Sequence, residues 1–305
     1  MKYIVLIVDG AAGLPLPAAE NKTCLELAST PNLDKLAQEG LVGLARTVPE
    51  NMEPSSACAC MSVMGYDPIV YYKGRAAIEA ISMSIPIEKN EVVFRCNLVN
   101  IENGIMKSYC ADHITTPEAK KLIGALNTEL GNQKIRFYPG VGYRHILKLI
   151  GQTETLKTIT NPPHDISNQN IAAHLPRGTG SSILLELIKN SQSVLENHPI
   201  NIERVKKGQL PANSIWLTWG SGQPPLLPSF KDKYRLSAAI TSGVDLLNGL
   251  GKMMGMEILD IPGVTDDASN DCHAQTEGAL KALEANDLVI IHYEAPDEAG
   301  HAGSI

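Results

Sequence analysis

Two aspartates and a histidine occupy positions in the sequence where a metal ion could bind. Asp9 ends a short apolar run over residues 3–8, and Asp297 follows a second apolar run, with His301 four residues later. If a helical turn carries Asp297 and His301, their side chains share one face, because positions i and i+4 are neighbours on a helix. Carboxylate oxygen and imidazole nitrogen together suit Mn²⁺ or Zn²⁺. The spacing predicts a metal site, whereas the more ordinary interpretation of each aspartate is a turn residue beside glycine or proline.

A pair of serines, Ser55 and Ser56, precedes a stretch whose small and apolar residues have helical spacing up to Gly65. A serine at the start of a helix meets unpaired backbone N–H groups and the positive end of the helix dipole, which together favour a phosphate group. The alternative is that one of these serines only caps the helix. The stretch by itself leaves both interpretations open.

The elements that must position these residues are typical of an α/β protein. The runs at 3–8 and 288–293 are continuous and β-branched, which predicts parallel strands buried on both faces. Ligands of such sheets bind beyond the carboxyl ends of the strands, so Asp9 and Asp297 should face a site. Further strands are predicted at 41–48 and 256–261, and helices from Pro31 and at 56–65, 238–251 and 274–285.

The middle of the chain differs from both ends. Residues 73–230 contain shorter predicted strands (92–98, 135–138 and 145–150), polar loops and two proline pairs. This change predicts one domain formed by residues 1–72 and 231–305, and a second, α+β domain of residues 73–230 inserted into it.

Composition excludes several classes of function. A net charge of −7 over 305 residues excludes a nucleic-acid binder that works by bulk positive charge. No apolar run is long enough for a membrane span, and six scattered cysteines are typical of reduced thiols in a cytoplasmic protein. Cys58 and Cys60 form Cys-x-Cys rather than the Cys-x-x-Cys of zinc sites, so we expect no metal role for them.

Specific motifs over the whole chain carry a resemblance to a known family. They are IVDG (7–10), VPENMEPSSACACMSVMGYDP (48–68), YYKGRAAIEA (71–80), FRCNLV (94–99), HITTPEAKKL (113–122), FYPGVGYRHIL (137–147), PPHDI (162–166), PANSIWLTWGSG (211–222) and EAPDEAGH (294–301). With these motifs the chain resembles the archaeal-type cofactor-independent phosphoglycerate mutases and the related proposed homoserine kinase-type proteins. Both groups belong to the alkaline phosphatase superfamily.

The resemblance implies an alkaline phosphatase-like, mostly parallel sheet core with an inserted α+β domain. It implies interconversion of 3- and 2-phosphoglycerate in glycolysis and gluconeogenesis through a phosphoserine, with two divalent metal ions. Mn²⁺ is the leading candidate for these ions, and Zn²⁺ and Mg²⁺ are alternatives. Ser56 matches the nucleophile, Asp9 and Ser56 match ligands of one metal, and Asp297 and His301 match ligands of the other.

The inserted domain should bind a small phosphorylated substrate. Arginine suits this role because its planar guanidinium binds oxyanions through two hydrogen bonds. The matched motifs supply Arg75, Arg95, His113, Arg144 and His145 as substrate-binding candidates and Asp165 as a catalytic candidate. For each of them, a structural salt bridge or hydrogen bond is the competing interpretation. The sequence leaves open whether the chain forms a homo-oligomer.

The sequence departs from the family pattern at several positions. Ala57 and Cys60 replace an acidic residue and an asparagine near the nucleophile, Gln223 replaces a basic residue, and Ser269 stands where an aspartate is usual. The family continues for about a hundred residues beyond EAPDEAGH, roughly the size of a small domain, with an Asp-His pair and a final histidine as further ligands.

On this comparison, the 305-residue chain should retain only Asp9 and Ser56 at one metal site, and residues 288–293 should form an uncovered sheet edge or a half-covered strand. Both arguments predict negligible mutase activity. An inactive remnant is therefore one alternative, and the similarity to both groups leaves a homoserine kinase-type phosphotransferase as another. The absence of a Walker-type G-x-x-x-x-G-K-[ST] sequence favours the mutase over a nucleotide-dependent enzyme.

Overall fold

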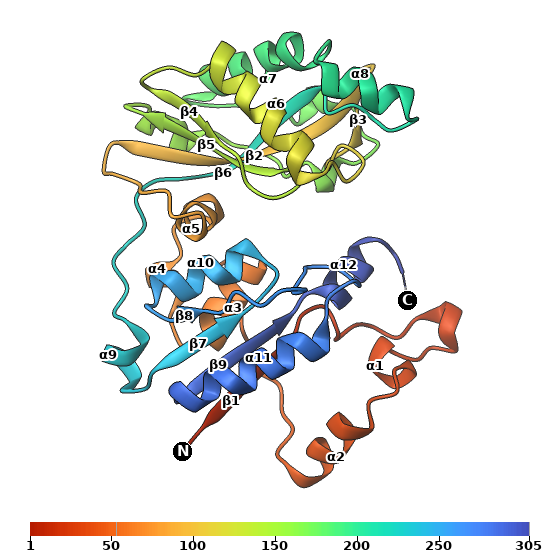
Figure 1. Cartoon of the computed structure of the whole chain (residues 1–305), viewed down its shortest axis with the longest axis vertical. Helices are drawn as coiled ribbons and strands as arrows, with labels where there is room; N and C mark the ends of the chain where they lie inside the picture. Colours follow the sequence, from red (N-terminus) through yellow and green to blue (C-terminus); the bar gives the residue numbers. More distant parts are fainter. Residues whose placement is uncertain (53, 305) are drawn as a thin grey trace. The chain divides into compact units, whose positions relative to one another are not determined.

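The computed structural model describes residues 1–52 and 54–304, and it has a mixed α/β fold with one parallel and one antiparallel sheet (Figure 1). The chain divides into two compact units. Unit 1 comprises Met1–Tyr71 and Leu226–Ile305, and unit 2 comprises Tyr72–Pro225. No helix in the described part of the chain combines the length and the apolar character that crossing a membrane requires.

A parallel sheet forms the centre of unit 1. Among the described residues its order is β1-β9-β7-β8, and every neighbouring pair is parallel. The strands are β1 (Tyr3–Val8), β7 (Ala238–Thr241), β8 (Glu257–Ile258) and β9 (Leu288–Tyr293). The bounds predicted for β1 and β9 are confirmed. Helix α11 packs on β9 and β7, and Ala279 belongs to the same core cluster as Ala239, Val289 and Ile291 (Figure 1).

The sequence predicted that β1 is buried on both faces and that β9 lies at an edge of the sheet, and the structure shows the opposite arrangement. Strand β1 is an edge strand, and Tyr3, Ile4 and Leu6 are 43%, 50% and 44% exposed, so it is not buried on both faces. Strand β9 lies between β1 and β7, and its first five residues are buried. The prediction that residues 288–293 form an uncovered edge is therefore wrong, because strands on both sides satisfy the backbone of β9.

Three other predicted elements of unit 1 need correction. Residues 41–48 form no strand, and Leu41, Val42 and Leu44 are exposed, because no neighbouring strand pairs with them in the described part of the chain. The predicted helix at 238–251 begins as strand β7, and only α10 from Asp245 is helical. An apolar run this short is compatible with either element until its neighbours are known. The strand predicted at 256–261 contracts to the two residues of β8.

The predicted helices at the other positions of unit 1 are confirmed. They begin at Pro31 in α2, at Ser56 in α3 and at Cys272 in α11. The helices are α1 (Cys24–Leu27), α2 (Pro31–Glu39), α3 (Ser56–Val63), α4 (Pro68–Tyr71), α9 (Phe230–Tyr234), α10 (Asp245–Met253), α11 (Cys272–Ala285) and α12 (Ala295–His301), with a 3₁₀ turn, η1, at Pro17–Ala19.

An antiparallel sheet around the long strand β2 forms unit 2. Strands β3, β5 and β6 all pair with β2, and β4 pairs with β5. The strands are β2 (Glu91–Glu102), β3 (Ile105–Ser108), β4 (Ile135–Tyr138), β5 (Arg144–Ile150) and β6 (Ser214–Ser221). The three short strands predicted here are confirmed as β2, β4 and β5, whereas β3 and β6 were not predicted.

Helices cover both faces of this second sheet. Phe94, Leu147 and Leu184 belong to the core cluster on the face covered by α6 and α7, and Val93, Ile146 and Ala77 belong to the cluster under α5. The helices are α5 (Arg75–Ser82), α6 (Thr116–Glu129), α7 (Ser181–Leu195) and α8 (Pro199–Lys206), with 3₁₀ turns η2 (Thr153–Lys157), η3 (His164–Ile166) and η4 (Ile171–Ala173). Side chains alternate along a strand, so successive residues of β2 and β5 point to opposite faces of this sheet.

Candidate active site

The carboxyl ends of three neighbouring strands bring polar side chains together in unit 1. Asp9 follows β1, His292 lies near the end of β9, and Ser242 follows β7. His292 Nε2 lies 3.4 Å from Asp9 Oδ2 and 3.4 Å from Glu294 Oε2, while His292 Nδ1 lies 3.0 Å from Ser242 Oγ. The parallel sheet thus places a buried imidazole between carboxylates at the edge where ligands bind in such folds.

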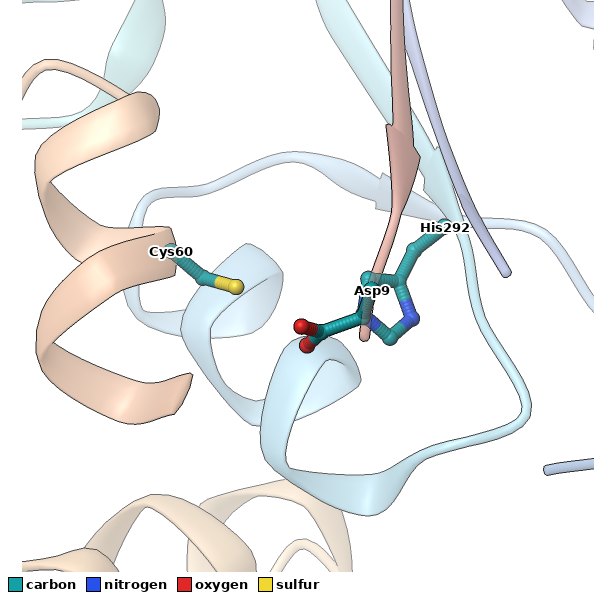
Figure 2. A group of neighbouring side chains, drawn as sticks. All are labelled: Asp9, Cys60 and His292. Atoms are coloured by element: carbon teal, nitrogen blue, oxygen red, sulfur yellow. The ribbon is translucent and has the colours of Figure 1, made fainter. Parts of the chain in front are cut away.

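A cysteine from helix α3 completes this group. The ligand atoms of Asp9, Cys60 and His292 all lie within 4.8 Å of one another, and Figure 2 shows the Cys60 side chain pointing toward the Asp9 carboxylate. Cys60 and His292 are buried, and Asp9 is partly exposed. The expectation of no metal role for Cys60 considered only its spacing from Cys58, whereas the fold brings potential donors to Cys60 from distant parts of the chain.

The electrostatics of this group favour a cation. The pKa of Asp9 is lowered, chiefly because its side chain hydrogen-bonds with His292 and despite the opposing effect of burial. Burial raises the pKa of the Cys60 thiol to about 12, and the nearby carboxylates Asp9 and Glu294 add to this rise. Two carboxylates beside a thiol give the site negative potential, which a bound cation would offset.

Asp297 and His301 form a second pair of potential ligands on α12. The predicted helical turn is confirmed, and His301 Nε2 lies 3.4 Å from Asp297 Oδ2 across positions i and i+4. Gly10 explains how α12 approaches the end of β1: it has a φ of +72°, and a Cβ at this position would lie 2.4 Å from Asp297 Cα. Position 10 therefore requires glycine, because a side chain there would collide with the backbone of Asp297.

The structure separates the roles of the two serines. Ser55 is the N-cap of α3, and its Oγ accepts a hydrogen bond from the Cys58 backbone N–H at 3.4 Å. Ser56 is the first helical residue and is half-buried. It lies four residues before Cys60, which places the two side chains on the same face of α3. Because Cys60 faces Asp9, Ser56 belongs to the face of α3 that carries the candidate site.

In unit 2, a buried carboxylate joins two of the predicted arginines. Glu79 Oε1 accepts hydrogen bonds from Arg95 Nη1 at 2.5 Å and from Arg75 Nε at 2.8 Å, and Arg95 Nε donates to Asn97 Oδ1 at 2.8 Å. Arg95 is only 4% exposed. Arg95 therefore donates hydrogen bonds to Glu79 and Asn97 inside unit 2. This agrees with the alternative interpretation of Arg95 as a residue of a structural salt bridge.

An aromatic residue that sequence reasoning missed lies beside these arginines. The guanidinium carbon of Arg75 is 4.6 Å from the centre of the Trp219 ring, and that of Arg95 is 5.7 Å from it. Trp219 has a φ of +54°, next to an irregularity in the β2–β6 register. Such bulges redirect a side chain, which explains how a strand residue comes to stack on Arg75.

The adjacent candidates Arg144 and His145 point to opposite faces of the sheet. Arg144 pairs with Asn97 in the β2–β5 register and shares the face of Arg95, whereas His145 pairs with Cys96 on the other face. Burial, together with Arg95 and Arg144, lowers the pKa of His145 to about 3, so this imidazole is neutral at physiological pH. His145 therefore offers no positive charge to a substrate.

The remaining two candidates lie on exposed loops of unit 2. His113 ends a run of three residues, 111–113, with φ of 48°, 56° and 50°, a left-handed conformation that costs non-glycine residues energy. The buried Arg204 holds this loop through a hydrogen bond to the Ala111 carbonyl. Asp165 lies in η3, 3.4 Å from His164 Nε2, and the His164 ring is 5.9 Å from Trp219. Asp165 is therefore adjacent in sequence to His164, whose ring lies near Trp219. The loop that carries His113 is instead bound to Arg204.

Comparison with known proteins identifies close relatives. The family model described as 2,3-bisphosphoglycerate-independent phosphoglycerate mutase matches residues 37–201. A protein of Methanosarcina acetivorans with this name is 46% identical over 305 residues, which cover 100% of this chain and 76% of the relative. A Geobacter sulfurreducens protein named as a probable enzyme of this kind is 44% identical over 309 residues, covering 100% of this chain and 77% of the relative.

Solved structures show the same similarity. The PH0037 protein of Pyrococcus horikoshii has a TM-score of 0.75 and 26% identity, over 98% of this chain and 72% of that protein. The cofactor-independent phosphoglycerate mutase of Thermoplasma acidophilum has a TM-score of 0.55 and 27% identity, over 96% of this chain and 77% of that protein.

Proposed function

Since this chain belongs to the 2,3-bisphosphoglycerate-independent phosphoglycerate mutase family, we propose that it interconverts 3- and 2-phosphoglycerate through a phosphoserine at Ser56. The observation that carries the proposal is the position of Ser56 on the face of α3 that is directed at Asp9. Names of the relatives support a mutase rather than a kinase-type transferase.

The proposed reaction moves one phosphoryl group twice. Ser56 Oγ forms a bond to phosphorus as the bond between phosphorus and the C3 oxygen breaks, and the serine proton passes to that oxygen. The glycerate then reorients, and its C2 oxygen forms a bond to phosphorus as the bond between phosphorus and Ser56 Oγ breaks, while the proton of the C2 hydroxyl passes to Ser56 Oγ. We propose Asp165 as a further catalytic group that acts on the substrate as an acid or base, since its carboxylate is exposed beside His164.

Members of this family depend on metal ions, and the residues of unit 1 fit two divalent cations. The Asp9 group offers carboxylate, imidazole and thiol donors, and Asp297 with His301 offers carboxylate and imidazole. When bound, such ions lower the pKa of a coordinated hydroxyl and offset phosphoryl charge. We propose Mn²⁺ as the leading ion at Asp297 and His301, with Zn²⁺ and Mg²⁺ as alternatives.

The expectation of negligible activity loses one of its two arguments, and the proposed donors Cys60 and His292 weaken the other. Cys60 and His292 bring the number of donors at Asp9 beyond the two that the sequence predicted. Strand β9, which was expected to be an uncovered edge, lies inside the sheet. We therefore expect measurable turnover by residues 1–305.

The test is conversion of 3- to 2-phosphoglycerate with added Mn²⁺ and without bisphosphoglycerate or nucleotide, beside the M. acetivorans relative. Conversion supports the proposal, and a parallel assay with ATP and homoserine should give no product. No conversion by the metal-loaded protein, under conditions in which the relative is active, would support the inactive remnant, and phosphorylation of homoserine would support the kinase-type alternative.

We propose unit 2 as the substrate-binding domain and unit 1 as the metal-binding domain with an alkaline phosphatase-like core. Arg75 and Arg95 both pair with the carboxylate of Glu79, and Arg144 is a further positive charge near Arg95, which supports binding of a phosphate or carboxylate in this part of unit 2. Six unpaired cysteines support a cytoplasmic location. A homo-oligomer stays a prediction.

Replacing Arg144 with alanine should weaken binding of 3-phosphoglycerate by about 10- to 100-fold, the range for loss of one charge-assisted hydrogen bond. Calorimetric titration measures this change. The matched control is Arg136→Ala, because Arg136 is an exposed arginine on the neighbouring strand β4 and should not affect affinity. Equal affinities of the two variants would assign Arg144 a structural role.

A further inference from the structure

The geometry points to Asp9, Cys60 and His292 as a mixed oxygen, sulfur and nitrogen site for a borderline-soft divalent cation, zinc in preference to manganese. This inference rests on the metal role of Asp9 in the proposed function, and it adds two ligands and a metal class to it. Sequence reasoning assigned neither Cys60 nor His292 to a metal.

The three donors already converge without any rearrangement of the chain. Their ligand atoms lie within 4.8 Å of one another, and they come from the end of β1, the middle of α3 and the end of β9 (Figure 2). Cys60 is 4% exposed and His292 is 1% exposed, so both are held in place by the packing around them. The Asp9 side chain is 25% exposed, which leaves the site open to ions from solvent.

The partners of His292 orient its ring as a ligand. Ser242 Oγ accepts a hydrogen bond from the Val244 backbone N–H at 3.0 Å and lies 3.0 Å from His292 Nδ1. Nδ1–H can donate to Ser242, and on metal binding the proton that Nε2 shares with Asp9 would be lost to solvent, which frees the Nε2 lone pair for the metal. Gln275 Nε2 also donates to the His292 carbonyl at 3.1 Å, which fixes the backbone at this position.

The donor set determines the metal class. Thiolate ligands select zinc and similar ions, whereas manganese and magnesium prefer sites built from oxygen. Three protein ligands with further coordination positions available is also the usual form of a catalytic zinc site. On binding, the Cys60 thiol loses its proton to solvent and coordinates as thiolate. The Asp297–His301 pair has no such sulfur ligand, so the two groups should differ in metal preference.

Cobalt provides a direct spectroscopic test, because a cobalt–thiolate bond gives a charge-transfer band in the near ultraviolet that oxygen and nitrogen ligands do not give. The full chain is titrated with Co²⁺, and then Zn²⁺ is added in competition. We expect the band in the unmodified protein, its loss in Cys60→Ser, and its displacement by Zn²⁺ at lower concentration than by Mn²⁺. Cys58→Ser is the matched control, since Cys58 is also buried in α3 but points elsewhere, two residues from Cys60.

Two further measurements keep the test independent of the folding of one variant. Zn²⁺ should slow alkylation of Cys60 in the unmodified protein at least tenfold, measured by mass spectrometry, without slowing alkylation of the exposed Cys272. Ser242→Ala should weaken Zn²⁺ binding by about 10- to 100-fold, as expected for a residue that orients a metal-bound histidine.

Each outcome decides the inference. Absence of the band in the unmodified protein, or its survival in Cys60→Ser, would overturn it. Mutase activity without the band would leave the proposed function standing and remove only the zinc site. The band without mutase activity would support the site and contradict the proposed function.

Discussion

Replacing Ser56 with alanine should abolish the phosphoenzyme and lower mutase turnover by on the order of a thousandfold or more, as expected when a covalent nucleophile is removed. The alanine side chain has no oxygen to accept the phosphoryl group. Ser56 is the first residue of α3 and does not serve as its N-cap, so the folded protein should tolerate the change. Turnover is measured with 3-phosphoglycerate, and the phosphorylated residue is identified by mass spectrometry.

Ser55→Ala is the matched control because it should give the opposite pattern. The Ser55 hydroxyl caps α3 through the Cys58 N–H, and loss of such a cap costs about 1 kcal/mol of stability. We therefore expect a lower free energy of unfolding for Ser55→Ala with phosphorylation at Ser56 retained. A phosphoenzyme in Ser56→Ala that disappears in Ser55→Ala would show that the nucleophile is Ser55.

Strands β1 and β9 of the parallel sheet could be predicted from sequence because their apolar runs are short, continuous and bounded by polar residues. The run at β1 ends at Asp9, and the run at β9 begins after Asp287, so both strands had clear limits. Burial could not be predicted in the same way. Whether an apolar strand is central or at an edge depends on its neighbours, which is why Leu6 is exposed and Val289 is not.

In the candidate site, too, local features could be predicted from sequence and contacts between distant elements could not. Asp9, Asp297 and His301 could be selected from sequence because strand ends and a four-residue spacing are local features. Cys60 and His292 could not, because they approach Asp9 only through packing of α3 and pairing of β1 with β9. A search for polar residues near the ends of buried strands would have selected His292. No local signal distinguishes Cys60 from its neighbour Cys58.

Replacing Glu79 with leucine should destabilise unit 2 by about 3–5 kcal/mol, because removing one partner leaves a buried charge without compensation. Glu79 is 5% exposed and lies between Arg75 and Arg95, and Arg95 is itself 4% exposed. Urea unfolding followed by tryptophan fluorescence measures the change, since Trp216 and Trp219 both lie in β6 of this unit. Glu129→Leu in α6 is the control, because that glutamate is exposed.

Replacing Glu79 should also change how the stability of the protein depends on pH. Burial raises the pKa of Glu79, but the ion pairs and hydrogen bonds with Arg95 and Arg75 outweigh it, so the pKa lies below its ordinary value of 4.5. A carboxyl whose pKa is lowered by folding stabilises the protein fully above its unfolded-state pKa, and this contribution is lost as the pH falls through the folded-state value. Unmodified protein should therefore lose stability below about pH 4.5, and Glu79→Gln should lose less over that interval.

A double variant separates the buried charge from the packing of the side chains. If the cost of Glu79→Leu comes from the unpaired guanidinium of Arg95, adding Arg95→Met should restore most of the stability, since apolar residues can replace a buried ion pair. Arg75 is less affected, because its side chain is 26% exposed and stays hydrated. If the double variant is no more stable than Glu79→Leu, the loss comes from packing. In the expected case, the fold of unit 2 retains a costly buried pair that an apolar pair could replace, which supports a role for these arginines in binding an anion.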